Sequence, residues 1–399
     1  MANNNDKKVL NVPALRFPEF TGEWEKCKLS KVCSFFSGGT PPSSNKEYYN
    51  GNIPFIRSGE LHNDETELFI TKEGLDNSAA KMVEVGDLLL ALYGATSGDI
   101  AISKIKGAIN QAILCIRTKQ NKKFVESVWN KHVARLLQTY LQGGQGNLSA
   151  DIVKNIPFYF TNIEEQNKLA RFISLLDQRI AAQNKIIEKL QSLIKGLNDS
   201  LYKQYGNAIT TSFSDLGHSY SGLSGKSSED FGNGKPFITY LNVYSNSVVN
   251  ENEYQYVRIN DGEKQNIVQC GDVLFTLSSE TPEEVGVGSV YLGIDEVFLN
   301  SFCFGFQIDN KELAYPPYFS YYVSSTPFRK FIYPFAQGST RFNLCRADFE
   351  KASIKLPSLN NQKHIYAILN SITEKIETEK NLLEYYTTQK QYLLRQMFI

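Results

Sequence analysis

The 399-residue sequence lacks the cysteine and histidine patterns that hold metal ions. Its 6 cysteines form no C-x-x-C pair, and its 4 histidines stand far apart from one another. Structural zinc sites need such closely spaced ligands. We therefore expect reduced, mostly buried cysteines and no metal site.

Long apolar runs are also missing. No stretch approaches the roughly 18 consecutive apolar residues of a membrane-spanning helix. The polar, charged segment 1–12 contains no apolar core of a signal peptide. These absences predict a cytoplasmic protein.

Complete catalytic motifs are absent as well. The NIPF sequences at 52–55 and 155–158 resemble the N-P-P-Y/F box of adenine methyltransferases, but Ile replaces a Pro and no glycine-rich cofactor loop precedes them. The GKS sequence at 225–227 resembles the end of a phosphate-binding loop, but Tyr220 stands where its first Gly belongs. We expect neither an active site nor a bound cofactor on this chain.

An excess of one charge sign is missing too, since 42 Lys and Arg balance 42 Asp and Glu. The balance hides an asymmetry, because the net charge is +3 over residues 1–163 and −6 over residues 205–360. Neither half has the basic footprint of a nucleic-acid-binding domain by itself.

A heptad pattern is present between residues 164 and 204. Nine of ten positions taken at alternate steps of four and three are aliphatic, and no Pro interrupts them. One helix of about 38 residues would be about 57 Å long, which exceeds the width of a compact domain, so it needs a partner. The predicted seam residues of this helix are Leu169, Ile173, Leu176, Ile180, Ile187, Leu190 and Ile194.

A second heptad pattern occupies residues 361–399. It aligns with the first without a gap at an offset of 196, which matches Gln166 with Gln362 and the polar exceptions Gln183 with Glu379. We expect the polar exceptions to set the register of a coiled coil; a tolerated, partly exposed position is the alternative. The seam residues of this second helix are Ile365, Leu369, Ile372, Ile376 and Leu383.

The two globular halves repeat one order of strands and turns. Apolar, β-branched segments at 53–57, 86–93 and 108–116 suit a mostly antiparallel sheet, and a helix is expected over 122–142. The second half repeats this order, with a helix expected over 315–331. We predict an α+β protein with an internal pseudo-twofold repeat, whose parts are globular domains 1–163 and 205–360 and helices 164–204 and 361–399.

Several short motifs occur in one order along the chain. They are Ser37-Gly-Gly-Thr-Pro, Ile53-Pro-Phe-Ile, Gly86-Asp87, Gln142-Gly-Gly with Asn147-Leu148, Ile156-Pro157 and Glu165-Gln166. With the duplication and the two helices, this order resembles the specificity (S) subunit of type I restriction-modification systems. The second half departs from it at Ser221-Gly-Leu-Ser-Gly and at Asn300-Ser301.

This resemblance implies two target recognition domains that read the halves of a bipartite, asymmetric DNA sequence, held apart by an antiparallel pair of helices. It implies a non-catalytic subunit that serves host defence against foreign DNA. Two modification (methyltransferase) subunits, which carry S-adenosylmethionine, would dock on it. Restriction subunits, which use ATP and Mg, would join the complex.

Candidate base contacts follow from residue type. Gly-rich loops allow close approach of the backbone, and Arg, Asn and Gln make bidentate contacts with base edges. In the first domain we expect contacts from Thr40, Arg57, Tyr93, Gln111, Gln142, Gln145 and Asn147. In the second we expect them from Tyr240, Asn242, Ser279, Asn300, Gln337, Arg341 and Asn343. For each residue, a hydrogen bond that shapes a turn or cap is the alternative role.

The acidic second domain sets a condition on DNA binding, because phosphate contacts from Lys and Arg supply most non-specific affinity. Either the modification subunits supply these contacts or the domain gathers its few cations on one face. Those cations are Lys226, Lys235, Arg329, Lys330, Arg341 and Arg346. We expect the chain alone to bind DNA weakly.

Two other functions fit parts of the sequence. A fused methyltransferase or nuclease would bind S-adenosylmethionine or a metal ion on this chain. A coiled-coil adaptor with two protein-binding domains would suit the neutral net charge.

Overall fold

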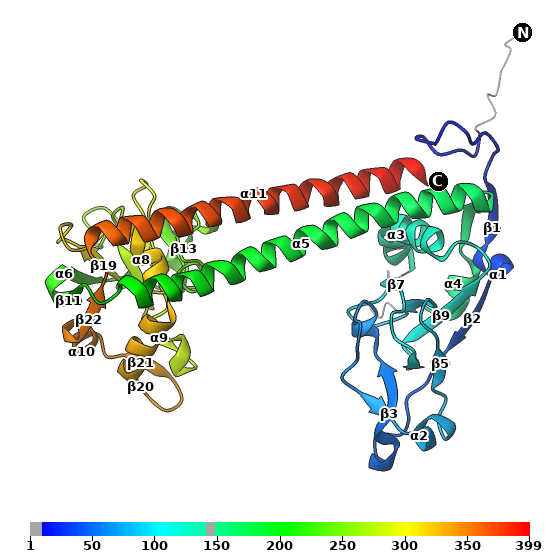
Figure 1. Ribbon diagram of the computed structural model, residues 1–399, viewed down its shortest axis with the longest axis horizontal. Helices are drawn as coiled ribbons and strands as arrows, with labels where there is room; N and C mark the ends of the chain where they lie inside the picture. The colour runs from blue at the N-terminus through cyan, green and yellow to red at the C-terminus, as the bar shows by residue number, and fades with distance from the viewer. Residues whose placement is uncertain (1–9, 141–147) are drawn as a thin grey trace, which may run out of the picture. The chain divides into compact units, whose positions relative to one another are not determined.

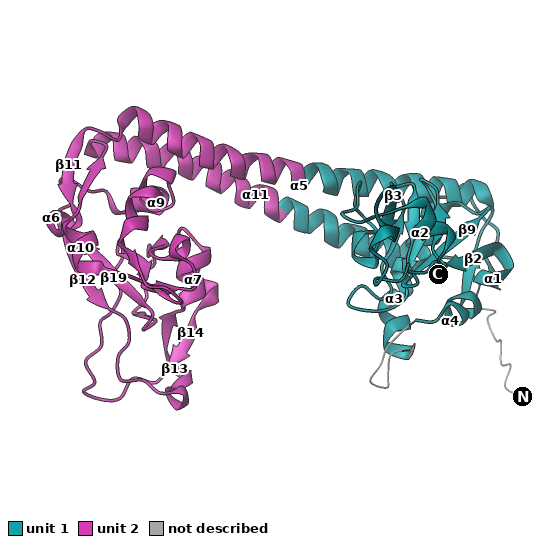
Figure 2. Cartoon of the chain, turned by 90° about the horizontal axis from the view of Figure 1, so that it is seen from below, with its two compact units in different colours: residues 1–184, 382–399 teal, residues 185–381 magenta. Residues whose placement is uncertain are grey.

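The structure, a computed structural model, describes residues 10–140 and 148–399. The chain divides into two compact units, shown in two colours in Figure 2: unit 1 contains residues 1–184 and 382–399, and unit 2 contains residues 185–381. Each unit contains a globular head and parts of two long helices. Within the described residues, no helix is long and apolar enough to cross a membrane.

The long helices are α5 (Ile163–Tyr205) and α11 (Leu359–Met397), which run side by side in Figure 1. In unit 1 the beginning of α5 packs with the end of α11, and in unit 2 the end of α5 packs with the beginning of α11. The pairing is therefore antiparallel in each unit. All twelve predicted seam residues are buried or half-buried.

The polar exceptions in the seam are buried. Gln183 is 5% exposed and Glu379 is 8% exposed. Lys375, one turn away on the same helix, lies 2.5 Å from the Glu379 carboxylate. The alternative of partly exposed seam positions is therefore wrong.

The first head contains two four-stranded sheets. The sheet β2-β9-β6-β7 is antiparallel throughout, whereas the sheet β4-β3-β8-β5 contains a parallel pair, β3 with β8. The strands are β2 Cys33–Ser37, β3 Tyr49–Ile56, β4 Phe69–Ile70, β5 Lys81–Val83, β6 Leu88–Ala91, β7 Ile100–Ile102, β8 Gly107–Ile109 and β9 Ile113–Thr118.

Strand β6 is apolar at every position because both faces of its sheet are covered. Leu88 and Leu90 face the core around Trp24, and Leu89 faces a second core around Ile56. The apolar segment 108–116 contributes to two strands, β8 and β9, which belong to two different sheets. Asn110 makes the turn between them, and its Oδ1 accepts a hydrogen bond from Ala112 N at 3.0 Å.

The second head repeats this topology. Sheet β12-β19-β15-β17 corresponds to the antiparallel sheet, and sheet β14-β13-β18 again contains a parallel pair, β13 with β18. A third sheet has the order β16-β21-β20. The strands are β12 Gly217–Ser221, β13 Phe231–Ile238, β14 Gln255–Val257, β15 Val273–Thr276, β16 Ser278–Ser279, β17 Gly288–Val290, β18 Phe298–Leu299, β19 Cys303–Ile308, β20 Ala336–Gln337 and β21 Phe342–Leu344.

Short elements complete both heads. Antiparallel pairs β1 with β10 and β11 with β22 lead into the long helices; they are β1 Glu25–Lys28, β10 Pro157–Phe160, β11 Ile209–Ser212 and β22 Ser353–Leu356. The short helices are α1 Leu29–Val32, α2 Lys72–Asp76, α4 Ala150–Asn155, α6 Phe213–Leu216, α7 Tyr240–Ser245 and α10 Arg346–Lys351.

The helix expected over 315–331 is broken, although its counterpart α3 (Lys122–Tyr140) is continuous. The segment forms a 3-10 turn η6 (Pro316–Tyr318), α8 (Phe319–Tyr322) and α9 (Thr326–Ile332). The Ser325 hydroxyl caps α9 by accepting a hydrogen bond from Phe328 N at 3.3 Å. Pro327 fits the first turn of a helix but would interrupt a continuous one. The expectation of a single helix was therefore wrong.

Candidate nucleic-acid interface

A pocket of about 350 Å³ opens in the second head. Three predicted contact residues line it and come from separate segments: Tyr240 from α7, Ser279 from β16 and Arg341 from the β20–β21 hairpin. The other lining residues are Leu241, Tyr244, Ser278, Glu280, Glu284 and Phe302. We name this site the aromatic pocket.

Two tyrosines stack in the aromatic pocket. The rings of Tyr240 and Tyr244 are 6.1 Å apart and inclined by 13°, because residues four apart share one face of α7. The Tyr240 hydroxyl donates a hydrogen bond to Ser278 O at 3.0 Å, and burial raises its pKa. The phenol therefore stays protonated at neutral pH and remains a hydrogen-bond donor.

Arg341 presents a cation at the edge of the aromatic pocket. Its Nε donates a hydrogen bond to Ser278 Oγ at 2.8 Å, and its guanidinium lies 5.5 Å from the centre of the Phe302 ring. In the described part of the chain no carboxylate forms an ion pair with Arg341. The guanidinium is thus oriented by the head while its charge stays uncompensated.

Glu284 supplies an acceptor in the same pocket. Its carboxylate accepts hydrogen bonds from Ser279 Oγ and from the Tyr244 hydroxyl, both at 2.7 Å. These bonds lower the pKa of Glu284, and the carboxylate raises the pKa of Tyr244. Donors and an acceptor therefore converge beside exposed aromatic surface.

Two more predicted residues belong to the adjoining sheet. Gln337 pairs with Asn343 across the β20–β21 hairpin, and Asn343 pairs with Ser278 of β16. Gln337 and Asn343 are both exposed. Five of the seven residues predicted for this head thus lie in or next to the aromatic pocket.

The remaining two shape turns. Asn242 is 0% exposed, and its amide bonds to Asn250 N and Asn250 O at 3.0 and 2.8 Å, so we withdraw it from the contact set. Asn300 Oδ1 accepts a hydrogen bond from Phe302 N at 2.9 Å. Asn300 therefore positions Phe302, whose side chain is 53% exposed.

The first head brings together a different pair. Thr40 Oγ1 donates a hydrogen bond to Gln111 Oε1 at 2.5 Å, which joins the loop after β2 to the turn between β8 and β9. Both residues are exposed. Tyr93 is half-buried against the core around Trp129. The predicted residues Gln142, Gln145 and Asn147 lie outside the described residues.

Arg57 is exposed, but its guanidinium forms ion pairs within the first head. Its guanidinium lies 2.8 Å from Glu60 and 2.9 Å from Glu67, and these hydrogen bonds raise its pKa. Burial alone would raise the pKa of Glu60, but hydrogen bonds from Arg57 and from Thr66 lower it to about 2. A base contact by Arg57 would have to replace these ion pairs.

The two heads attach equivalent loops in the same way. Leu148 N donates a hydrogen bond to Leu92 O at 2.8 Å, and Leu344 N donates one to Leu277 O at 2.9 Å. Leu92 and Leu277 are the residues that directly follow strands β6 and β15, so the two bonds are equivalent. Tyr93 therefore occupies the place that Ser278 has in the aromatic pocket.

Residue type alone missed six residues that line the aromatic pocket. They are Leu241, Tyr244, Ser278, Glu280, Glu284 and Phe302. The spacing of four between Tyr240 and Tyr244 was a usable signal within a helix. Phe302 offered none, because an aromatic residue beside a strand is expected in the core.

Comparisons with known proteins agree with this architecture. The family model of the type I restriction modification DNA specificity domain matches residues 21–192 and 211–385, so the chain belongs to this family. The resemblance and the fold class predicted from the sequence are thereby confirmed.

Two specificity subunits of Methanocaldococcus jannaschii are similar in sequence. The type I restriction enzyme MjaVIII specificity subunit is 24% identical over 193 residues, 47% of this chain and 43% of that protein. The MjaIX specificity subunit is 27% identical over 182 residues, 42% of each protein. The chain thus spans less than half the length of these relatives.

Solved structures share the fold. A type I restriction-modification S subunit from M. genitalium is 15% identical, with a TM-score of 0.54 over 97% of this chain and 99% of that one. A chain from a structure on complex assembly and conformational transition of the type I R-M system is 16% identical, with a TM-score of 0.60 over 94% and 97%.

Proposed function

We propose that this chain is the non-catalytic, sequence-reading subunit of a type I restriction-modification complex. Each head reads one half of a bipartite DNA target. The two heads share strand topology and the same asparagine turn, in which Asn110 and Asn300 accept a hydrogen bond from the backbone N two residues later. The side chains that these turns present differ: Gln111, bonded to Thr40, in the first head and exposed Phe302 in the second. The shared strand topology, together with different side chains at these turns, is the observation that supports an asymmetric target.

The aromatic pocket has the chemistry of base recognition in the major groove. An arginine with free terminal nitrogens matches the paired acceptors of guanine, and a carboxylate accepts from the cytosine amino group. Arg341 and Glu284 supply these groups in the second head. Exposed Phe302 offers an apolar contact to a thymine methyl group.

The long helices serve as the docking surface for two methyltransferase subunits, and restriction subunits join that core. Large apolar side chains remain exposed along α5 and α11 outside the buried seam, and a partner subunit that packs there would cover them. These residues are Leu175 (55% exposed), Ile186 (43%), Leu193 (50%), Tyr385 (74%) and Tyr392 (58%).

Methylation mapping tests the proposal. Genomic DNA is compared from cells that make this chain with its methyltransferase partner and from cells that make the partner alone. We expect a methylated adenine motif in two parts with a fixed gap, present only with the chain. Absence of a chain-dependent motif, with the partner shown to be active, would refute the proposal and favour an adaptor role.

A further inference from the structure

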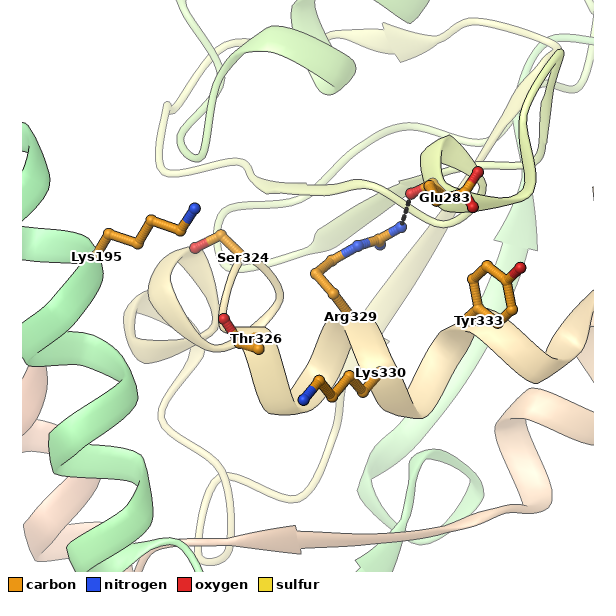
Figure 3. A pocket seen from close by; sticks show the side chains of 7 residues that line it. All are labelled: Lys195, Glu283, Ser324, Thr326, Arg329, Lys330 and Tyr333. Atoms are coloured by element: carbon orange, nitrogen blue, oxygen red, sulfur yellow. Dashed lines mark hydrogen bonds between the residues drawn. The ribbon is translucent and has the colours of Figure 1, made fainter.

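A second pocket, of about 380 Å³, lies in unit 2 between α5 and α9. Figure 3 shows Lys195 extending from α5 toward Ser324, with Arg329 and Lys330 on α9. Thr326, Tyr333 and Glu283 complete the lining. Three lining side chains are cations and one is an anion. We name this site the cationic pocket.

Hydrogen bonds to neutral backbone groups hold the Arg329 side chain in place without neutralising its charge. Its guanidinium donates to three backbone carbonyls, those of Gly286, Glu283 and Val285, at 2.5, 2.7 and 2.8 Å. Burial lowers its pKa. A buried charge is unfavourable unless an opposite charge compensates it. The pocket is therefore suited to an anionic ligand.

Several other cations of this acidic head form ion pairs with its own carboxylates. Lys226 lies 2.6 Å from Glu263, Lys235 lies 3.5 Å from Glu296, and Arg346 lies 3.7 Å from Glu350. Within the described residues, no ion pair involves Lys195, Arg329 or Lys330. Three cations without an ion pair thus line one pocket, with α5 supplying one of the three groups.

The cationic pocket adjoins the aromatic pocket. The turn η5 (Pro282–Glu284) forms part of both walls, since Glu283 lines the cationic pocket and Glu284 lines the aromatic pocket. A duplex with base edges at the aromatic pocket would carry its backbone past this turn.

We propose that the cationic pocket binds a backbone phosphate of the DNA, in a contact independent of sequence; this rests on the proposed function. Lys195 and Lys330 supply charge, and the hydroxyl of Thr326 donates a hydrogen bond. The Ser324 hydroxyl, which donates to Tyr321 O at 3.0 Å, forms part of the pocket wall. Arg329 holds the pocket wall through its three carbonyl contacts. Because Lys195 belongs to α5, the contact ties a long helix to the DNA backbone and fixes the register of the head on the duplex.

The test uses the full-length chain and fluorescently labelled duplexes of unrelated sequence. The variant K195Q/K330Q removes two exposed cations of the pocket. The control K264Q/K311Q removes two exposed lysines of the same head that do not line the pocket, so the net charge changes equally. Thermal unfolding of both variants is compared with that of the native chain.

The pocket variant should reduce the magnitude of the slope of log affinity against log salt by about 0.9, because it loses one phosphate contact and each such contact contributes about 0.9. Its affinity deficit relative to the native chain should therefore shrink about three- to fourfold between about 50 and 200 mM salt. The deficit should be the same for every duplex sequence, and the control should keep the native slope. An equal loss of DNA affinity in the control, or a loss of affinity confined to one duplex sequence, overturns the proposal.

Two further measurements separate other ligands. The first is calorimetric titration with inorganic phosphate. If only the native chain binds phosphate and the variant binds DNA as the native chain does, the pocket is assigned to free phosphate and the DNA assignment is overturned. The second is co-purification with the methyltransferase partner. If the variant no longer co-purifies with the partner but keeps its DNA affinity, the pocket is assigned to a protein contact and the DNA assignment is again overturned. Failure of the proposed function appears separately, as a missing chain-dependent methylation motif.

Discussion

Gln166 and Gln362 make two matching hydrogen bonds in two different units. Both are 0% exposed, and each donates from Nε2 to the carbonyl five residues earlier in the chain. Each accepts through Oε1 a hydrogen bond from the backbone of its own head, from Asn121 N at 3.1 Å and from Tyr315 N at 2.8 Å. One glutamine per unit therefore fastens a head to the first turn of a long helix.

The substitution Gln166→Met should destabilise unit 1 by about 2 to 4 kcal/mol, because it leaves a buried N–H and a buried carbonyl without partners. Denaturant unfolding followed by tryptophan fluorescence measures this loss. The chain's two tryptophans, Trp24 and Trp129, both lie in unit 1 and are each 1% exposed. The matched control Gln362→Met acts in unit 2 and should leave this transition in place; an equal shift in both variants would contradict the assignment.

Glu60 makes the stability of unit 1 depend on pH. Its pKa in the folded chain is about 2, against an ordinary value of 4.5. A lowered pKa stabilises the fold above the ordinary value, and this contribution disappears as pH falls from about 4.5 toward 2. The gap in unfolding free energy between native chain and Glu60→Gln should therefore be largest at neutral pH and close over that window. Tryptophan fluorescence at several pH values measures it, with exposed Glu65→Gln as control; a gap independent of pH would be a negative result.

Arg341→Ala should relax specificity in one half of the target only. A lost bidentate base contact corresponds to about 1 to 3 kcal/mol of discrimination. Methylation mapping of cells with the variant should show one degenerate position in one half-site and an unchanged second half-site. Arg346→Ala, which removes an arginine paired with Glu350, is the matched control and should retain the native motif. Weakened methylation with unchanged base preference would assign Arg341 to the backbone instead.

The helix pair should set the length of the non-specific gap. Insertion of one heptad after Asn184 and another after Lys380, equivalent positions in the repeat, adds about 10.5 Å to both helices and keeps the seam in phase. The gap in the methylated motif should lengthen by about three base pairs, at about 3.4 Å each. Insertion of two residues at both sites, which rotates each helix by about 200°, should take the seam out of phase and abolish methylation. An unchanged gap after the heptad insertion would show that another element sets the spacing.

The sequence predicted the long helices because their burial is periodic. Leu169 and Ile365 occupy seam positions in patterns that repeat over several turns, and the offset of 196 links them. The break before α9 could not be predicted in this way, because aromatic residues continue at helical spacing across Ser325. There the cap formed by Ser325 and the place of Pro327 outweigh the periodic pattern.

Residue type predicted some of the side chains that line the aromatic pocket, but it predicted the roles of individual residues less well. Tyr240 and Arg341 line it as side chains from distant segments. The burial of Asn242 depends on Asn250, and the engagement of Arg57 depends partly on Glu67, ten residues away. The fold decides which groups come within hydrogen-bond distance of each other, and the sequence alone does not show them. A side chain suited to base contact is therefore equally suited to holding a turn.

Unit 1 is assembled from segments that are far apart in the order of synthesis. Leu15 N donates to Gln396 O at 2.9 Å, and the rings of Trp24 and Phe398 are 6.3 Å apart. All of unit 2 is translated between these segments, which takes about 10 to 40 s at about 5 to 20 residues per second. Until then the ribosome-bound chain exposes the apolar side of α5 around Ile173. Unit 2 is thus complete first, and the nascent first head is the part that chaperones would have to protect.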